Sequence, residues 1–92
     1  MVYLPAGRQA RTSMYYVYLL KSVKTGKIYK GLTGNIDRRF DEHQNGRVSS
    51  TKSILPLELI HVEICKDRKS ARELEKYFKS GYGREIALEL AC

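Results

Sequence analysis

The sequence predicts a small α+β domain in which a three-stranded antiparallel sheet is flanked by helices, in the order ββαβαα. A hairpin pattern comes first, and two segments with a helical period follow it, separated by one alternating apolar segment. The chain has 92 residues, of which 42% are hydrophobic, and this is enough for one domain with one core.

Residues 1–13 differ from the rest of the chain. They contain Pro5, Gly7 and two arginines but no acidic residue, and their apolar residues follow no period. We therefore expect a flexible tail or an added extension over residues 1–13, and a single domain over residues 14–92.

The predicted hairpin begins with Tyr15 to Leu20, which is apolar at every position and is typical of a central strand. Lys24 to Lys27 supplies a turn with a glycine, where a positive φ is expected. Ile28 to Leu32 then forms the second strand. We expect Gly31 and Gly34 to end this strand and to let the backbone turn closely.

A helix is predicted from Ile36 to about Asn45, because Asn35 is a favourable N-cap. Ile36 and Phe40 lie one turn apart and should face the core. Residues 47–53 are small, polar and basic, so we expect a surface loop there. This loop could either hold phosphates or simply connect two elements.

The third strand is predicted over Leu57 to Cys65, with one buried face and one polar face. Asp67 should cap a helix from Arg68 to Lys79. A last helix is expected after Gly83. The apolar residues assigned to these faces are Ile60, Val62 and Ile64 in the strand, and Ile86, Leu88 and Leu90 in the last helix.

The charge favours a polyanionic partner, since 17 lysines and arginines face 10 acidic residues and the formal charge is +7. Cys65 and Cys92 lie far apart, which suggests neither a zinc site nor a disulfide framework. We expect a reducing, cytoplasmic location. No apolar run approaches membrane-spanning length, so no membrane association is expected.

One carboxylate is predicted to face inward. The apolar stripe of the second helix comprises Ala71, Leu74 and Phe78, and Glu75 falls on it. An inward carboxylate is costly unless it is paired or binds a cation such as Mg²⁺. An edge position, or an ion pair with Arg72 or Lys79, would also explain it.

Two tyrosines are candidates for positioning or deprotonating a water molecule. If Leu20 lies opposite Tyr29, then Tyr18 lies opposite Gly31 and both phenols share one face of the sheet. Ordinary packing is the alternative explanation for both side chains.

Arg39 and His43 are four residues apart on the first helix and should project from one face. Arginine offers a planar fork to phosphate oxygens, and histidine can donate to phosphate or transfer a proton. The alternative is a solvated face on which Arg39 pairs with Asp41, with Glu42 or with no partner.

Together these motifs resemble the GIY-YIG nuclease superfamily. The similarity is closest to its short stand-alone bacterial members, which are related to the N-terminal domain of the excision-repair nuclease C subunit. It spans Met14 to about Leu90 and rests on Tyr16-Val17-Tyr18, Tyr29-Lys30-Gly31, Thr33-x-Asn35-x-x-x-Arg39-x-x-x-His43, Ala71-x-x-x-Glu75 and Lys79-Ser80-Gly81-Tyr82-Gly83-Arg84.

The resemblance implies the GIY-YIG fold and an endonuclease that hydrolyses DNA with one Mg²⁺ or Mn²⁺ ion. Glu75 would hold the metal, and Tyr18 and Tyr29 would position or activate the attacking water. Arg39 would stabilise charge on the phosphoryl oxygens, and His43 would assist proton transfer or contact phosphate. A role in DNA repair follows as an expectation, with branched, damaged or single-stranded DNA among the candidate substrates. The expected nucleic-acid contacts are Lys30, Arg38, Arg47 and Lys52.

The sequence departs from the family pattern in three places. Tyr16 stands where the first motif has glycine, Lys30 stands where the second has isoleucine, and no asparagine follows Asn45. The alternative function is therefore a non-catalytic nucleic-acid-binding module on the same fold.

Overall fold

The computed structural model describes residues 14–91; the tail predicted for residues 1–13, and Cys92, lie outside the described residues. The fold is α+β, as predicted. Its elements are β1 (Tyr15–Ser22), β2 (Ile28–Thr33), α2 (Ile36–Gln44), the short 3₁₀ helix η1 (Lys52–Ile54), β3 (Leu57–Cys65), α3 (Arg68–Lys79) and α4 (Gly81–Leu90).

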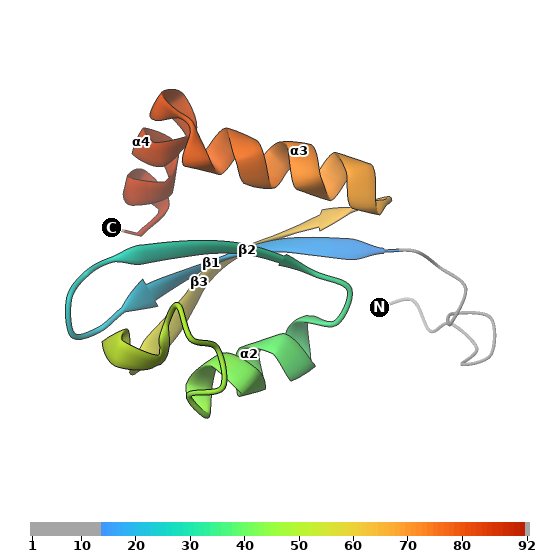
Figure 1. The fold of residues 1–92 in the computed structure, drawn as a ribbon. Coiled ribbons are helices and arrows are strands. Elements are labelled where there is room, and N and C mark those ends of the chain that lie inside the picture. The colour runs from blue at the N-terminus through green and yellow to red at the C-terminus, as the bar shows by residue number, and fades with distance from the viewer. Residues whose placement is uncertain (1–13, 92) are drawn as a thin grey trace.

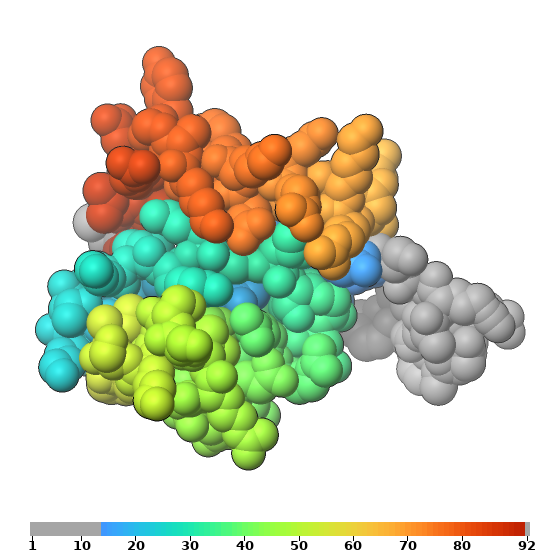
Figure 2. Space-filling view, viewed as in Figure 1, coloured from blue at the N-terminus to red at the C-terminus, as the bar shows by residue number. Residues whose placement is uncertain are grey.

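The three strands form one antiparallel sheet in the order β2-β1-β3, which confirms the central position expected for β1. The helix α2 covers one face, and α3 and α4 cover the other (Figure 1). The β2 edge reaches the surface between these two helical layers (Figure 2). None of the helices in the described part of the chain is long and apolar enough to cross a membrane.

Each face of the sheet carries its own hydrophobic cluster. The cluster under α3 and α4 is built on Val17, Leu19, Cys65, Ala71, Phe78 and Ala87. The cluster under α2 is built on Tyr18, Leu20 and Leu57, with Ile36, Phe40 and others packed against them. Alternate residues of β1 therefore enter opposite clusters, as the side-chain period of a strand requires. The inward orientation predicted for Ile36 and Phe40 is confirmed.

The hairpin has the predicted register, with Tyr18 opposite Gly31 and Leu20 opposite Tyr29. Gly26 adopts the positive φ expected in the turn, at 78°. The role predicted for Gly31 was wrong, because β2 continues through it to Thr33. Gly31 instead leaves room for the Tyr18 ring, which a Cβ atom at this position would overlap.

Both predicted N-caps are present. Asn35 Oδ1 accepts a hydrogen bond from the Arg38 amide at 3.1 Å, and Asp67 Oδ1 accepts one from the Ser70 amide at 2.8 Å. These oxygens satisfy amides that would otherwise lack partners in the first helical turn. The helix α2 stops at Gln44, one residue short of its predicted end, and Asn45 is its C-cap.

The alternation predicted for β3 was wrong at its centre. Leu19 pairs with His61 but Leu20 pairs with Leu59, so Ile60 is an extra residue opposite β1. This irregularity reverses the alternation, as a β-bulge does. As a result Ile60 packs on the α3 side and Val62 on the α2 side, while Ile64 is 62% exposed.

The segment over residues 47–53 is not a pure surface loop, which corrects the prediction. Val48 is 8% exposed and Thr51 is fully buried, whereas Arg47 and Lys52 are exposed. The segment ends in η1 and packs against the α2 layer. The burial of Thr51 places its hydroxyl against the His43 ring.

The last helix starts earlier than predicted, at Gly81 rather than after Gly83. Its buried residues are Gly83 and Ala87, so the prediction that its larger apolar residues face inward was also wrong. Gly83 lies so close to the Tyr77 backbone that a Cβ atom would overlap it. Close backbone contact, rather than large side chains, therefore holds α4 against α3. Ile86, Leu88 and Leu90 are between 39% and 54% exposed.

Candidate functional site

Tyr18 and Tyr29 lie on the same face of the sheet, because the register places Tyr18 beside Gly31 and Tyr29 beside Leu20. Their ring centroids are 6.3 Å apart. Tyr18 is almost fully buried at 1% exposed, whereas Tyr29 is half-buried. The two phenols predicted from the hairpin pattern are therefore neighbours beneath α2.

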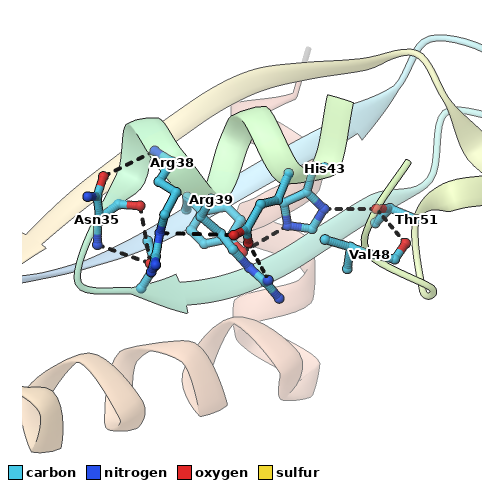
Figure 3. Close-up of polar contacts among 9 residues, drawn as sticks. Asn35, Arg38, Arg39, His43, Val48 and Thr51 are labelled. Atoms are coloured by element: carbon cyan, nitrogen blue, oxygen red, sulfur yellow. Dashed lines mark hydrogen bonds and ion pairs between the residues drawn. The ribbon is translucent and has the colours of Figure 1, made fainter. Parts of the chain in front are cut away.

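The helix α2 brings Arg39 and His43 to these tyrosines from the same side of the helix (Figure 3). The cap at Asn35 fixes where the helix starts, and therefore which side chains face the sheet. The His43 ring lies 5.7 Å from the Tyr18 ring and 5.0 Å from the Tyr29 ring, edge-on to both. Four of the five predicted catalytic side chains thus form one group.

His43 is fully buried between two hydroxyl groups. Its Nε2 atom lies 3.0 Å from Tyr18 Oη, and its Nδ1 atom lies 2.8 Å from Thr51 Oγ1. Burial lowers the pKa of His43, and the nearby Arg39 guanidinium lowers it further. A neutral ring that is buried in this way can act on a substrate only through its neighbours.

Arg39 links the tyrosines to the surface of α2. Its Nη1 atom donates to Glu42 Oε1 at 2.9 Å, which is one of the partners foreseen in the alternative explanation. The nearby Tyr18 oxygen and Glu42 both raise the pKa of Arg39. Its side chain remains 34% exposed, so the guanidinium can also reach a bound anion.

The Tyr18 phenol experiences two opposing effects. Burial is the larger and raises its pKa, because a phenolate is poorly solvated there. The neighbouring Arg39 guanidinium lowers the pKa, since it favours the charged form. The negative charge of Glu75 acts in the same direction as burial. The protein alone therefore keeps Tyr18 as a neutral phenol, and additional positive charge would be needed to ionise it at neutral pH.

Glu75 occupies the other helical layer, on α3. Its side chain is 20% exposed and its Oε2 atom lies 3.5 Å from Lys79 Nζ. This confirms the inward stripe and also finds one of the ion pairs proposed as an alternative. Glu75 is close enough to act electrostatically on Tyr18, although no contact links it to the four residues beneath α2.

The donor set near Glu75 fits a hard divalent cation held mainly by water and phosphate. Within residues 14–91, no group of three or more histidine, cysteine, aspartate or glutamate side chains could enclose a metal ion. Magnesium commonly binds through one or two carboxylates together with waters and substrate phosphates. The contact of Glu75 with Lys79 is long, at 3.5 Å, and the lysine side chain is 56% exposed, so the carboxylate is available for such a role.

The predicted nucleic-acid contacts are spread over two layers. Arg38, Arg47 and Lys52 are exposed on or after α2, and Arg38 lies 4.0 Å from Glu42. Lys30 is half-buried on β2, where burial lowers its pKa. The charges of Arg84 and Lys79 lower the pKa of Lys30 further, so three cations, from β2, α3 and α4, influence one another on this side of the sheet.

The sequence interpretation missed three residues of this site. Thr51 was included only in a polar loop, and nothing in that segment's pattern marked it as buried. Lys79 and Arg84 were quoted in a motif without a binding role. Arg84 Nη2 donates to the Lys79 carbonyl at 3.1 Å, which ties the start of α4 to the end of α3. The signal available in the sequence was that both cations lie close to the predicted end of the second helix, with no acidic residue between them.

Comparison with known proteins agrees with this geometry. Residues 14–87 match the GIY-YIG catalytic domain. The chain belongs to the GIY-YIG family. Its Tyr18, Tyr29, Arg39, His43 and Glu75 all fall within the matched range.

Relatives of this GIY-YIG chain are small proteins of the UPF0213 group. A UPF0213 protein of Photorhabdus laumondii is 40% identical over 68 residues, covering 73% of this chain and 64% of the relative. The match thus spans slightly less than two thirds of that protein. A UPF0213 protein of Bacillus licheniformis is 35% identical over 69 residues, covering 74% of this chain and 70% of the relative.

One solved structure is also similar. It is the solution NMR structure of the UPF0213 protein BH0048 from Bacillus halodurans, with 29% sequence identity and a TM-score of 0.51. The similarity covers 84% of both chains. The GIY-YIG domain therefore accounts for nearly all of the described structure.

Proposed function

We propose that this GIY-YIG chain is a metal-dependent endonuclease that hydrolyses phosphodiester bonds in DNA. The observation that carries the proposal is the group of Tyr18, Arg39 and His43 beneath α2. Tyr18 Oη lies 3.0 Å from His43 Nε2, and Arg39 and Glu75 both act electrostatically on the Tyr18 phenol. Ordinary hydrophobic packing would not require a buried histidine and a buried phenol to meet through their polar atoms.

In this reaction water attacks phosphorus, the bond from phosphorus to the leaving oxygen breaks, and the water gives up a proton. Tyr18 or Tyr29 would orient the water and, once ionised to a phenolate, would accept that proton, while the leaving oxygen takes up a proton from solvent water. Arg39 would donate to a phosphoryl oxygen as negative charge develops there. His43 has no exposed surface, so it would act through Tyr18 rather than contact the DNA.

Glu75 would hold the divalent ion that the family implies. When bound, Mg²⁺ or Mn²⁺ would supply positive charge against the phosphate and favour deprotonation of the water. Positive charge near Tyr18 would also oppose the effect of burial on this phenol. Lys79 would have to release Glu75, which is a small cost for a 3.5 Å contact on a half-exposed side chain.

Cleavage of plasmid, single-stranded and branched DNA with Mg²⁺ or Mn²⁺ tests the proposal. We expect the wild type to cut at least one of these substrates and to stop when the metal is chelated. Glu75→Gln and Arg39→Ala should each lower kcat by about 100-fold, because each removes a group that stabilises charge in the transition state. Comparison of the three substrates also tests whether branched DNA is preferred.

Matched controls are available on the exposed side of α3. Glu73→Gln and Arg72→Ala remove the same charges two residues from Glu75 and one turn before it, and both should cleave like the wild type. Cleavage that survives both Glu75→Gln and Arg39→Ala without loss would contradict the site assignment.

A second function is favoured by the three cations beside β2, Lys30, Lys79 and Arg84. They would support a non-catalytic nucleic-acid-binding module even if the phenols were inactive. Salt-sensitive DNA binding, with no cleavage under either metal, would select this function instead.

A further inference from the structure

Thr51 forms a contact that the proposed mechanism does not use. It lies between α2 and η1, is fully buried, and places its hydroxyl 2.8 Å from His43 Nδ1 (Figure 3). A hydroxyl can donate or accept, so this contact alone does not say which atom carries the hydrogen. The other partners of the hydroxyl decide it.

The other acceptor near the Thr51 hydroxyl is already occupied. The Val48 carbonyl oxygen lies 3.5 Å away, at the outer limit for a hydrogen bond. The same oxygen accepts the Thr51 amide at 3.1 Å and the Lys52 amide at 3.0 Å. Because a carbonyl oxygen has two lone pairs, the Thr51 hydrogen finds its better acceptor in His43 Nδ1.

The role of Nδ1 also determines which ring nitrogen carries the hydrogen. Burial and Arg39 both disfavour the doubly protonated ring, so His43 carries one ring hydrogen. If Nδ1 accepts from Thr51, that hydrogen is on Nε2, which lies 3.0 Å from Tyr18 Oη. The Tyr18 oxygen would then accept a hydrogen bond from His43, and the Arg39 guanidinium would act electrostatically on the same oxygen.

We propose that Thr51 is a positioning residue that fixes His43 in the tautomer with hydrogen on Nε2, so that His43 donates to the Tyr18 oxygen. In this arrangement His43 does not take a proton from Tyr18, because its remaining lone pair is occupied by Thr51. His43 and Arg39 together stabilise negative charge on the Tyr18 oxygen. The consequence for cleavage rests on the proposed nuclease function, whereas the tautomer itself does not.

The tautomer can be measured directly in the wild-type protein. Nitrogen-15 NMR distinguishes a protonated ring nitrogen from a bare one. We expect His43 Nε2 to be protonated and Nδ1 to be bare and hydrogen-bonded at neutral pH, in the absence of DNA and metal. A bare Nε2 in the wild type would overturn the proposal, since Tyr18 would then be the donor.

Two substitutions test whether Thr51 sets the tautomer. Thr51→Val keeps the shape of the side chain but removes the hydroxyl, so the Nε2 signal should shift toward that of a bare nitrogen. Thr51→Ser keeps the hydroxyl and should restore the wild-type signal. If Thr51→Val folds but leaves the tautomer unchanged, Thr51 is only a packing residue and the proposal fails.

Kinetics give a second and independent result. Thr51→Val should lower kcat about tenfold, the effect of one lost hydrogen bond to a charged group, and leave KM for DNA unchanged. Thr51→Ser should recover most of the rate. An unchanged kcat in a folded Thr51→Val protein would contradict the role of the tautomer in cleavage. If the wild type cleaves no DNA, the proposed function fails, but the NMR measurement still decides the tautomer.

Discussion

At the scale of single residues, the surroundings of His43 determine its protonation. Its side chain is fully buried, and protonation would place a cation next to the Arg39 guanidinium. Burial is the main cause of its lowered pKa, and Glu42 opposes this only in part. The folded state therefore favours the neutral form of the His43 ring over the protonated form.

This preference predicts a loss of stability in mild acid. The folded pKa lies below the ordinary value of 6.5, so the unfolded chain binds more protons as the pH falls through and below that value. Stability should be unaffected by His43 above about pH 7.5 and should fall progressively toward about pH 5. Urea unfolding of the wild type and of His43→Gln across this range would measure the effect.

The test compares how steeply the free energy of unfolding changes with pH in the two proteins. It does not compare their absolute stabilities, because His43→Gln also changes two hydrogen bonds. The substituted protein should lose less stability between the two pH values than the wild type loses. Equal losses in both proteins would show that another group is responsible.

Among the elements, the β1–β2 hairpin holds the Tyr18 ring in place. Gly31 lies opposite Tyr18, and the absence of a side chain there creates the space that the ring fills. The phenol is thereby directed beneath α2, where His43 and Arg39 reach its oxygen. A strand glycine with no positive φ is thus required by packing, not by backbone conformation.

Gly31→Ala should therefore displace Tyr18. We expect destabilisation by about 1–3 kcal/mol, as is usual when an extra methyl group is forced into a packed site. Loss of the close edge-on contact between Tyr18 and His43 should be visible as altered ring signals in NMR spectra. Urea unfolding supplies the stability measurement.

Gly34→Ala, directly after the end of β2, is the matched control. A Cβ atom there would come no nearer than 3.5 Å to the Tyr15 ring, and the residue is exposed with no positive φ. It should be nearly neutral. If both alanine variants lose the same stability, the space beneath Tyr18 is not what constrains Gly31.

At the scale of the whole molecule, the positive charge is placed beside the site as well as spread over the surface. Lys30 comes from β2, Lys79 from the end of α3 and Arg84 from α4. Lys79 and Arg84 act electrostatically on Lys30, and Lys79 contacts Glu75. The close packing of Gly83 against the Tyr77 backbone keeps α4, and hence Arg84, in this position. A DNA strand that enters the site at the β2 edge would meet these cations.

Arg84→Gln should weaken DNA binding at low salt by removing one phosphate contact. The slope of the logarithm of affinity against the logarithm of salt concentration should fall by about one. Lys24→Gln, in the exposed turn between β1 and β2, removes the same charge away from this group and should leave the slope close to wild type. Equal effects from both substitutions would indicate that only net charge matters. Fluorescence anisotropy with a labelled duplex across a salt series would measure both slopes.

Much of this protein could be predicted from local patterns. The apolar run of β1 identified the central strand, and the hairpin pattern allowed the pairing of Tyr18 with Gly31 as one conditional register, which the structure confirms. Asn35 and Asp67 predicted both helix starts, since a cap acts within three residues of its own position. The five residues expected in the site could be selected because each lies at a fixed place in such a pattern; their catalytic roles stay predictions.

The tertiary structure decided what depends on contacts between distant segments. The extra residue at Ile60 arises from pairing with β1, and the early start of α4 depends on how closely Gly83 approaches Tyr77. Thr51 is eight residues from His43 and belongs to a polar stretch, so only the fold shows that its hydroxyl contacts the ring. By itself the sequence determined the elements and the candidate chemistry, because these follow from near neighbours along the chain. Burial, hydrogen-bond partners and the gathering of Lys30, Lys79 and Arg84 required the folded molecule, because packing between layers creates them.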